Sequence, residues 1–302
     1  MHRAGPLPPP YWPPDRLEDD RQRAVARFIE ERSREGTLAY KAAFDTNEPI
    51  VRRLFELTND LRDFTGEVFR DRHDLIPAAR FLGGPPVSDD DLKTLVGGRL
   101  GRRFDADLAR RVAEVLRAAW DPVRFPWLAE QRAPVDHERD AAIRWTAGIW
   151  AIERSRTGRR TESSRRQEQA VHAALQAEGY TLVQRRQPIT VLDELERGTF
   201  CREVLLASQK ADVPVRLRDG RLLALECKVS NSGVNSYKRL NHETGDKART
   251  WRQAFGAQAV PGAVLAGVFT LANLASAQDN PGIALFWEHD LTPLRDFVAG
   301  RV

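Results

Sequence analysis

Several residue types and segments that mark common protein classes are scarce in this sequence of 302 residues. The two cysteines, Cys201 and Cys227, form no CxxC pair, so neither a disulfide scaffold nor a thiolate metal site is expected. No apolar run approaches the roughly 18 residues of a membrane helix. The first residues, MHRAGPLPPPYWPP, lack the apolar core of a signal peptide. These absences predict a cytoplasmic protein.

The motifs of nucleotide-hydrolysing and acyl-transfer enzymes are also absent. The sequence contains no GxGxxG, no Walker loop and no GxSxG elbow. Its six histidines are scattered and do not form a metal triad. No segment repeats with a period of 20–50 residues, which excludes a solenoid.

Lysine is scarce although the net charge is +4. Four of the six lysines fall between residues 210 and 247, which indicates a local need for a compact ammonium in a chain that otherwise uses arginine. Two segments are densely basic: 154–166 has six arginines against one glutamate, and 227–260 has six cations against two acidic residues. Such density is typical of proteins that bind a phosphate backbone, although solvated helix faces give the same pattern.

The chain changes character near residue 155. Residues 1–14 read as a proline-rich flexible arm, residues 15–155 as a helical region for DNA binding or dimerisation, and residues 156–302 as the catalytic core. The expected helices of the first half are 16–34, 50–71, 106–120 and 137–154. The second half has expected strands at 180–186, 213–217, 222–229, 264–270 and 283–287, with helices at 165–178 and about 245–258. This order predicts an α/β fold with a mixed central sheet flanked by helices.

The apolar strand at 222–229, LLALECKV, carries two ionisable residues. Alternation along a strand puts Glu226 and Lys228 on one face with Leu222 and Ala224. A carboxylate and an ammonium on a buried strand are costly unless they are paired or bound to a metal. Either a structural salt bridge or a catalytic site explains them.

The preceding turn, Arg218-Asp219-Gly220, favours the catalytic explanation. A three-residue hairpin loop with Gly220 at positive φ sets Asp212 opposite Glu226, whereas a two-residue turn would send the two carboxylates to opposite faces. Like charges that face each other across a sheet are destabilising. A divalent cation such as Mg²⁺ between them removes the repulsion, and Lys228 then lies beside the metal.

The arrangement Asp212-(x13)-Glu226-x-Lys228 across a hairpin resembles the active site of the PD-(D/E)xK nucleases. The resemblance implies Mg²⁺ bound by Asp212, Glu226 and the backbone carbonyl of Cys227, with Lys228 activating water. It differs at Ala211, where the family name has proline.

A closer resemblance, to the XamI family of type II restriction endonucleases, covers most of the chain. It rests on DDDLKTL (89–95), RFPWL (124–128), RRQEQAV (165–171) and ECKVSNSGVNSYKRLN (226–241). It implies a restriction-endonuclease-like core and a homodimer that cuts a short palindrome in double-stranded DNA, with a methyltransferase as functional partner. The type member's site is GTCGAC. The alternatives are a structure-specific repair or recombination nuclease and a non-catalytic DNA-binding protein of the same fold.

Two further sets of residues are candidates for the site. Ser164 and Gln167 resemble a capping box that starts the helix at 165–178, in which Glu168 shares a face with Val171 and Leu175. In many PD-(D/E)xK enzymes a glutamate of this helix reaches the metal, although Glu168 could equally pair with Arg165 or His172 at the surface. The polar loop after the catalytic strand and the next helix supply expected DNA contacts: Asn231, Asn235, Lys238, Arg239, Asn241 and Lys247.

Overall fold

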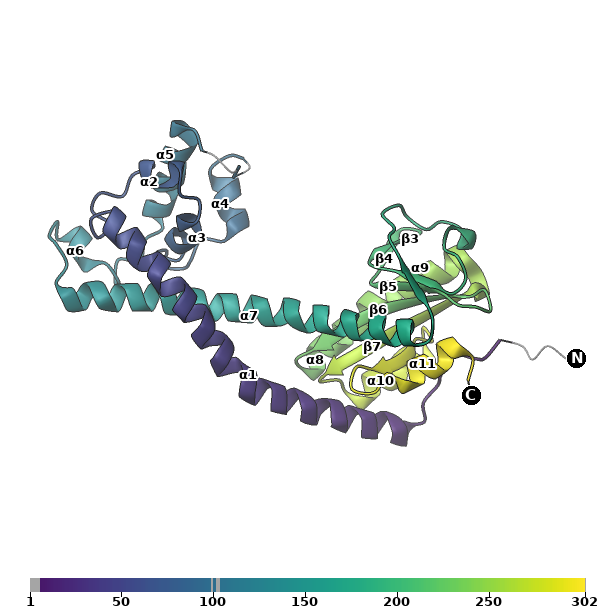
Figure 1. Cartoon of the computed structure of the whole chain (residues 1–302). Helices are drawn as coiled ribbons and strands as arrows, with labels where there is room; N and C mark the ends of the chain where they lie inside the picture. The colour runs from purple at the N-terminus through teal and green to yellow at the C-terminus, as the bar shows by residue number, and fades with distance from the viewer. Residues whose placement is uncertain (1–5, 99, 102–103, 302) are drawn as a thin grey trace, which may run out of the picture. The chain divides into compact units, whose positions relative to one another are not determined.

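The computed structural model describes residues 6–98, 100–101 and 104–301. The chain forms two compact units (Figure 1). The sheet unit comprises Met1–Ser33 and Arg160–Val302, and the helical unit comprises Arg34–Arg159. The boundaries fall inside two long helices, α1 (Pro14–Leu57) and α7 (Asp136–Ala177). The sequence placed the division near residue 155 and gave the whole first half to the helical region, whereas residues up to 33 belong to the sheet unit.

The sheet unit is built on six strands in the order β1-β2-β5-β6-β7-β8. β5 pairs antiparallel with both β2 and β6, whereas the β1–β2, β6–β7 and β7–β8 pairs are parallel. The strands are β1 (Thr181–Val183), β2 (Thr199–Cys201), β5 (Val213–Arg216), β6 (Leu222–Ser230), β7 (Ala259–Gly267) and β8 (Ala284–Trp287). The predicted mixed sheet is confirmed.

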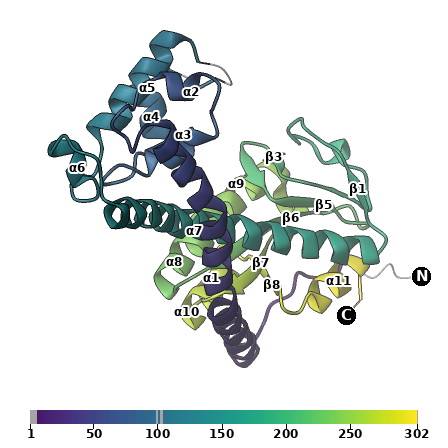
Figure 2. The ribbon, with the colours of Figure 1, turned by 60° about the vertical axis from the view of Figure 1, so that its left-hand side comes forward.

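Helices cover both faces of this sheet (Figure 2). One face carries Leu223 and Leu225 of β6 and packs against the end of α7 and against α11 (Thr292–Ala299). The opposite face packs against the beginning of α1, α9 (Gly245–Phe255) and α10 (Leu271–Asp279). β6 is therefore buried on both faces, as its nearly continuous apolar sequence predicts.

Three short strands were not expected from the sequence. They are β2 in the main sheet, and β3 (Val204–Leu206) and β4 (Gln209–Ala211), which form a separate hairpin. Each has three residues, and β4 contains the exposed Lys210. Segments this short are too brief to show the alternation on which the prediction of a strand depends.

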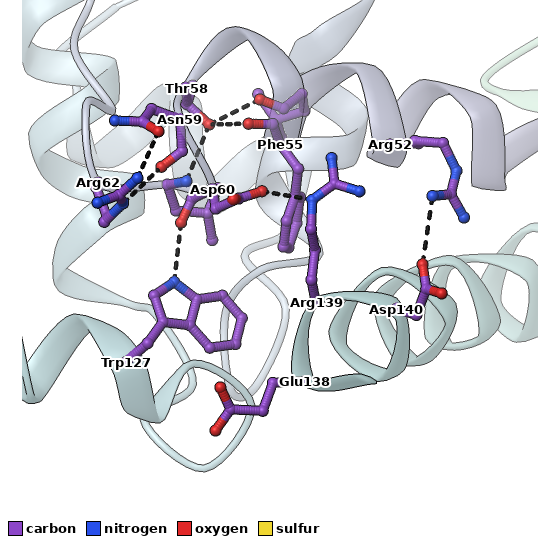
Figure 3. A network of polar contacts seen from close by, with 12 residues as sticks. Arg52, Phe55, Thr58, Asn59, Asp60, Arg62, Trp127, Glu138, Arg139 and Asp140 are labelled. Carbon is purple, nitrogen blue, oxygen red and sulfur yellow. Dashed lines mark hydrogen bonds and ion pairs between the residues drawn. The ribbon is translucent and has the colours of Figure 1, made fainter. Parts of the chain in front are cut away.

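The helical unit packs α2 (Glu67–Arg70), α3 (Leu75–Arg80), α4 (Asp89–Leu95), α5 (Ala106–Ala118) and α6 (Pro126–Ala129) against parts of α1 and α7. Its network of polar contacts lies where α1 ends (Figure 3). The carboxylate of Asp60 accepts a hydrogen bond from Arg139 at 2.6 Å, and the carbonyl oxygen of Asp60 accepts one from the indole of Trp127 at 2.9 Å. These contacts hold three successive residues, 59–61, at positive φ.

Both long helices run through positions where the sequence indicated breaks. α1 joins the segments expected as two helices, with Pro49 inside it. α7 continues through Ser164, so the expected helix start at 165 is wrong. Gln167 does not cap a helix. Its side chain is fully buried and donates a hydrogen bond to the carbonyl oxygen of Val264 at 3.2 Å, which fastens α7 to the sheet.

The proline-rich segment is packed, so the expectation of a flexible arm is wrong for the part that makes these contacts. The indole nitrogen of Trp12 donates to the carbonyl oxygen of Leu285 at 2.7 Å, and Leu7 packs on the sheet core. Tyr11 donates to the carboxylate of Asp279 at 2.7 Å. Residues 1–5 lie outside the described residues. No helix in the described ranges is long and apolar enough to cross a membrane.

Candidate active site

The hairpin of β5 and β6 has the register that the three-residue loop predicts. The backbone nitrogen of Leu217 donates to the carbonyl oxygen of Arg221 at 2.8 Å, and Val213 pairs with Leu225. One residue beyond the end of this ladder, Asp212 comes opposite Glu226. Gly220 has a φ of +99°, as predicted.

Replacing Gly220 with valine is expected to destabilise the hairpin by about 1 kcal/mol or more, because a β-branched residue adopts positive φ only at a cost. A Cβ at this position would also lie 3.1 Å from the guanidinium of Arg197. Urea unfolding and the cleavage rate measure the two consequences. Gly220→Asn is the matched control, since asparagine tolerates positive φ, and it should lose less of both. Equal losses in the two variants would contradict this explanation.

Glu226 is fully buried, and one oxygen of its carboxylate forms ion pairs with two lysine ammonium groups. Its Oε2 lies 2.6 Å from Nζ of Lys228 and 2.7 Å from Nζ of Lys247. Its Oε1 is buried and has no hydrogen-bond partner among the described residues. One oxygen of the carboxylate is therefore held in place, and the other is left for a ligand.

Asp212 lies beside the backbone of β6. Its Oδ2 accepts a hydrogen bond from the backbone nitrogen of Cys227 at 2.7 Å. The carboxylate is partly exposed, in contrast to that of Glu226. The bond places Asp212 beside the residue between Glu226 and Lys228, so the three predicted active-site side chains come together.

Burial and charge both act on these groups. Burial raises the pKa of Glu226, and the nearby Asp212 raises it further, while the two lysines act in the opposite direction. Burial lowers the pKa of Lys228, but the carboxylates of Glu226, Asp212 and Glu243 together outweigh it, and the net effect is a raised pKa. Asp212 and Glu226 therefore repel each other, and a cation bound between them relieves this repulsion.

Glu168 approaches the site from α7. Val171 and Leu175, which share its helix face, are fully buried against the sheet, whereas Glu168 is half-buried. Burial raises the pKa of Glu168, and Asp212 is the next largest cause. Within the described part of the chain Glu168 forms no ion pair, and Arg165 pairs with Glu162 at 3.0 Å instead. The surface-pair alternative therefore has no support in the structure.

The segment after β6 is helical, so the expectation of a polar loop at 230–241 is wrong beyond Ser232. α8 (Gly233–Tyr237) begins where Ser232 caps the backbone nitrogen of Asn235, and a π-helical stretch, η2 (Lys238–Thr244), continues into α9. Serine and asparagine favour caps as well as loops, which explains the error.

The six residues expected to contact DNA divide into two groups. Asn231, Asn235 and Lys238 are exposed, and the amide oxygen of Asn231 accepts a hydrogen bond from Arg32 at 2.9 Å. The others are engaged within the protein: the guanidinium of Arg239 donates to the carbonyl oxygen of Val229, and Asn241 donates to that of Asn273 at 3.3 Å. Lys247 is bonded to Glu226.

The contact of Lys247 with Glu226 was missed by the sequence reasoning, which assigned Lys247 to DNA. A signal was present, since Lys247, Trp251 and Phe255 recur every four residues and so share one face of α9. The two aromatic residues are buried against β6. A lysine in line with them also faces inward and needs an anionic partner.

Among the described residues, no group of three or more His, Cys, Asp and Glu side chains is arranged to hold a metal ion. The two facing carboxylates therefore supply only part of a coordination shell. The buried Oε1 of Glu226 without a partner is the observation that fits a cation, because a carboxylate oxygen is the ligand that Mg²⁺ prefers.

Most of the chain is similar to known proteins. Residues 59–287 match the family described as XamI restriction endonuclease. The chain belongs to this family. It is 37% identical over 268 residues to the type II restriction enzyme XamI of Xanthomonas campestris pv. amaranthicola, an alignment that covers 84% of this chain and 95% of that enzyme. No solved structure matches the chain.

The region matched to the XamI family includes most of the helical unit as well as the sheet. The segment RFPWL, which carries part of the resemblance, contributes to the core of the helical unit. Arg124 and Trp127 are buried there, and Phe125 packs on both Trp127 and Phe55. In this structure the segment therefore serves the packing of the helical unit.

Proposed function

We propose that this protein is a type II restriction endonuclease that uses Mg²⁺ to cut both strands of DNA at a short palindrome. The observation that carries the proposal is the buried Glu226 beside Asp212 and Lys228, in a chain that belongs to the XamI family. It acts on cytoplasmic DNA, with a cognate methyltransferase that protects the host. GTCGAC is the first sequence to test.

The site residues divide the chemistry among them. Asp212, Glu226 and the backbone carbonyl of Cys227 hold Mg²⁺, which supplies Lewis-acid activation of the phosphodiester and of water when bound. Lys228 orients the attacking water and offsets the charge that develops on the phosphate. Glu168 adds a third carboxylate next to Asp212. Water attacks phosphorus directly, without a covalent intermediate, while the bond from phosphorus to one ester oxygen breaks. The products are a phosphate monoester from one side of the cut and a hydroxyl group, formed when the leaving oxygen takes up a proton, from the other.

DNA contacts are proposed for the exposed residues that follow the catalytic strand. Asn231, Asn235 and Lys238 lie within a few residues of the end of β6 and present amide and ammonium groups. Amides and ammonium groups bind base edges and phosphates. Arg239 and Asn241 support this surface from within through their backbone contacts.

A plasmid digest tests the proposed activity. The purified protein with Mg²⁺ should give discrete fragments from plasmids that contain its site, and sequencing of the ends identifies the palindrome. EDTA should stop the reaction. Paired plasmids with and without GTCGAC test that sequence. Nicking only at branched or damaged DNA would instead indicate a repair nuclease, and no cleavage at all would indicate a DNA-binding protein.

We expect the enzyme to bind its site as a homodimer, because a two-fold symmetric protein reads a palindrome most simply. Sedimentation of the complex with a short duplex containing the site, in Ca²⁺ or without metal, should give two chains per duplex. One chain per duplex, together with products nicked in a single strand, would refute the dimer while leaving the nuclease activity intact.

A further inference from the structure

Lys247 lies on the inward face of α9, in line with two aromatic residues of the core. Trp251 is fully buried and Phe255 nearly so, and both pack with Leu222 and Ala224 of β6. These two β6 residues share a strand face with Glu226. α9 therefore lies on this face of the sheet, where the ammonium of Lys247 forms an ion pair of 2.7 Å with Glu226.

Lys247 is more buried than Lys238, the nearby lysine that faces solvent. Its side chain is 20% exposed, whereas Lys238 on the preceding helical stretch is exposed and forms no ion pair among the described residues. An ammonium already bonded to a fully buried carboxylate is poorly placed to bind a phosphate of DNA. Its structural partner is Glu226.

One ammonium group is enough to form a buried salt bridge with Glu226, so the second ammonium group on the same oxygen needs a separate explanation. Lys228 alone neutralises the charge of Glu226, and its Nζ lies 2.6 Å from Oε2. Lys228 is also the residue proposed to orient the attacking water, a task that draws its ammonium away from Glu226. Without a second partner, the buried carboxylate would then lose its only anchor and would be free to change rotamer.

We propose that Lys247 is a positioning residue, which holds Glu226 through Oε2 so that Oε1 stays available to the metal while Lys228 acts on the water. The inference rests on the proposed nuclease function and adds a residue to its site. Lys247 holds the carboxylate from α9, a different element from the strand that carries Glu226 and Lys228. The position of Glu226 thus depends on the docking of α9 against the sheet.

The test compares Lys247→Met and Lys247→Arg with the wild type. Single-turnover cleavage is measured with saturating enzyme and Mg²⁺, well below the unfolding midpoint of each variant. We expect Lys247→Met to lower the rate constant by about 100-fold, the scale of loss for a misplaced catalytic group. DNA affinity without metal should stay within twofold. Lys247→Arg keeps the positive charge within reach of Oε2 and should recover at least tenfold of the loss.

Lys210→Met is the matched control, because Lys210 is exposed and its ammonium pairs with Glu203 and not with a carboxylate of the site. It should leave both the DNA affinity and the rate at saturating enzyme close to those of the wild type. If Lys247→Met instead weakens DNA binding and keeps the wild-type rate at saturating enzyme, Lys247 is a DNA contact and the proposal is wrong. A Lys247→Met rate equal to that of the wild type also overturns it.

Crystal structures of Lys228→Met and of the double variant Lys228→Met/Lys247→Met, both without metal, supply a readout that does not depend on activity. The Glu226 carboxylate should keep its position in the single variant, where Lys247 still holds Oε2, and should leave it in the double variant. A carboxylate that moves in the single variant, or that keeps its place in both, overturns the proposal whatever the rate does. A wild-type protein that fails to cut any DNA with Mg²⁺ would overturn the proposed function instead. The two failures are therefore distinguishable.

Discussion

Replacing Asp212 with asparagine or Glu226 with glutamine should abolish DNA cleavage, with a loss of about 1,000-fold or more in the single-turnover rate. Each change removes one negative charge from the proposed Mg²⁺ site and keeps the size of the side chain. A loss of that size corresponds to roughly 4 kcal/mol of transition-state stabilisation, which is reasonable for a group that binds a catalytic metal. The measurement is cleavage of a duplex that carries the mapped site, at saturating enzyme.

Folding and DNA binding provide the controls for these variants. Asp212 is partly exposed, so Asp212→Asn should leave the unfolding midpoint and the DNA affinity nearly unchanged. Lys228→Met should likewise bind DNA and fail to cut it. Full cutting activity in a purified Glu226→Ala protein would refute the assignment of the site. If a variant loses both its folded structure and DNA binding, its loss of cleavage reflects lower stability and not the loss of a catalytic group.

Replacing Arg124 with leucine should destabilise the helical unit by about 3–5 kcal/mol, because it leaves buried acceptors without a donor. The Arg124 side chain is fully buried. All five of its N–H groups are used, and their acceptors are the carbonyl oxygens of Phe81, Leu82 and Gly83, the hydroxyl of Thr146 and the carboxylate of Asp121. No other side chain replaces this set of donors.

Hydrogen exchange of the full-length protein localises the effect. Peptides around residues 78–83 and 142–147 should lose protection by about 100-fold or more, whereas peptides of β6 and β7 should change little. Arg110→Met is the matched control, since Arg110 is exposed and its partners Asp107 and Glu114 are exposed too; a change within about 0.5 kcal/mol is expected. Similar protection in Arg124→Leu and Arg110→Met would show that the buried network contributes little.

The hairpin of β5 and β6 could be predicted because its signals are local. The apolar run of β6 is interrupted only by Glu226 and Lys228, and strand alternation alone decides which neighbours they share a face with. Gly220 fixes the length of the turn, and the length of the turn fixes the register. These features need no information from distant parts of the chain, and so Asp212 could be set opposite Glu226 from sequence.

Features that depend on tertiary contacts could not be predicted. Gln167 resembles a capping residue until its burial against Val264 is known, and Trp12 lies in a proline-rich segment whose partners are more than 250 residues away. The ammonium of Lys247 could have gone to DNA or to Glu226, since both carry negative charge. Only the docking of α9 on β6 decides between them.

The packing of the N-terminal segment has a consequence for the order in which the protein folds during synthesis. The helical unit is one continuous stretch, so it can fold as soon as residue 159 has left the ribosome. Trp12 bonds to Leu285, 273 positions later, and Leu17 packs among residues of β7 and β8. At roughly 10 residues per second, the beginning of α1 therefore waits about half a minute for its partners. Trp12 and Leu17 are synthesised long before the strands against which they pack.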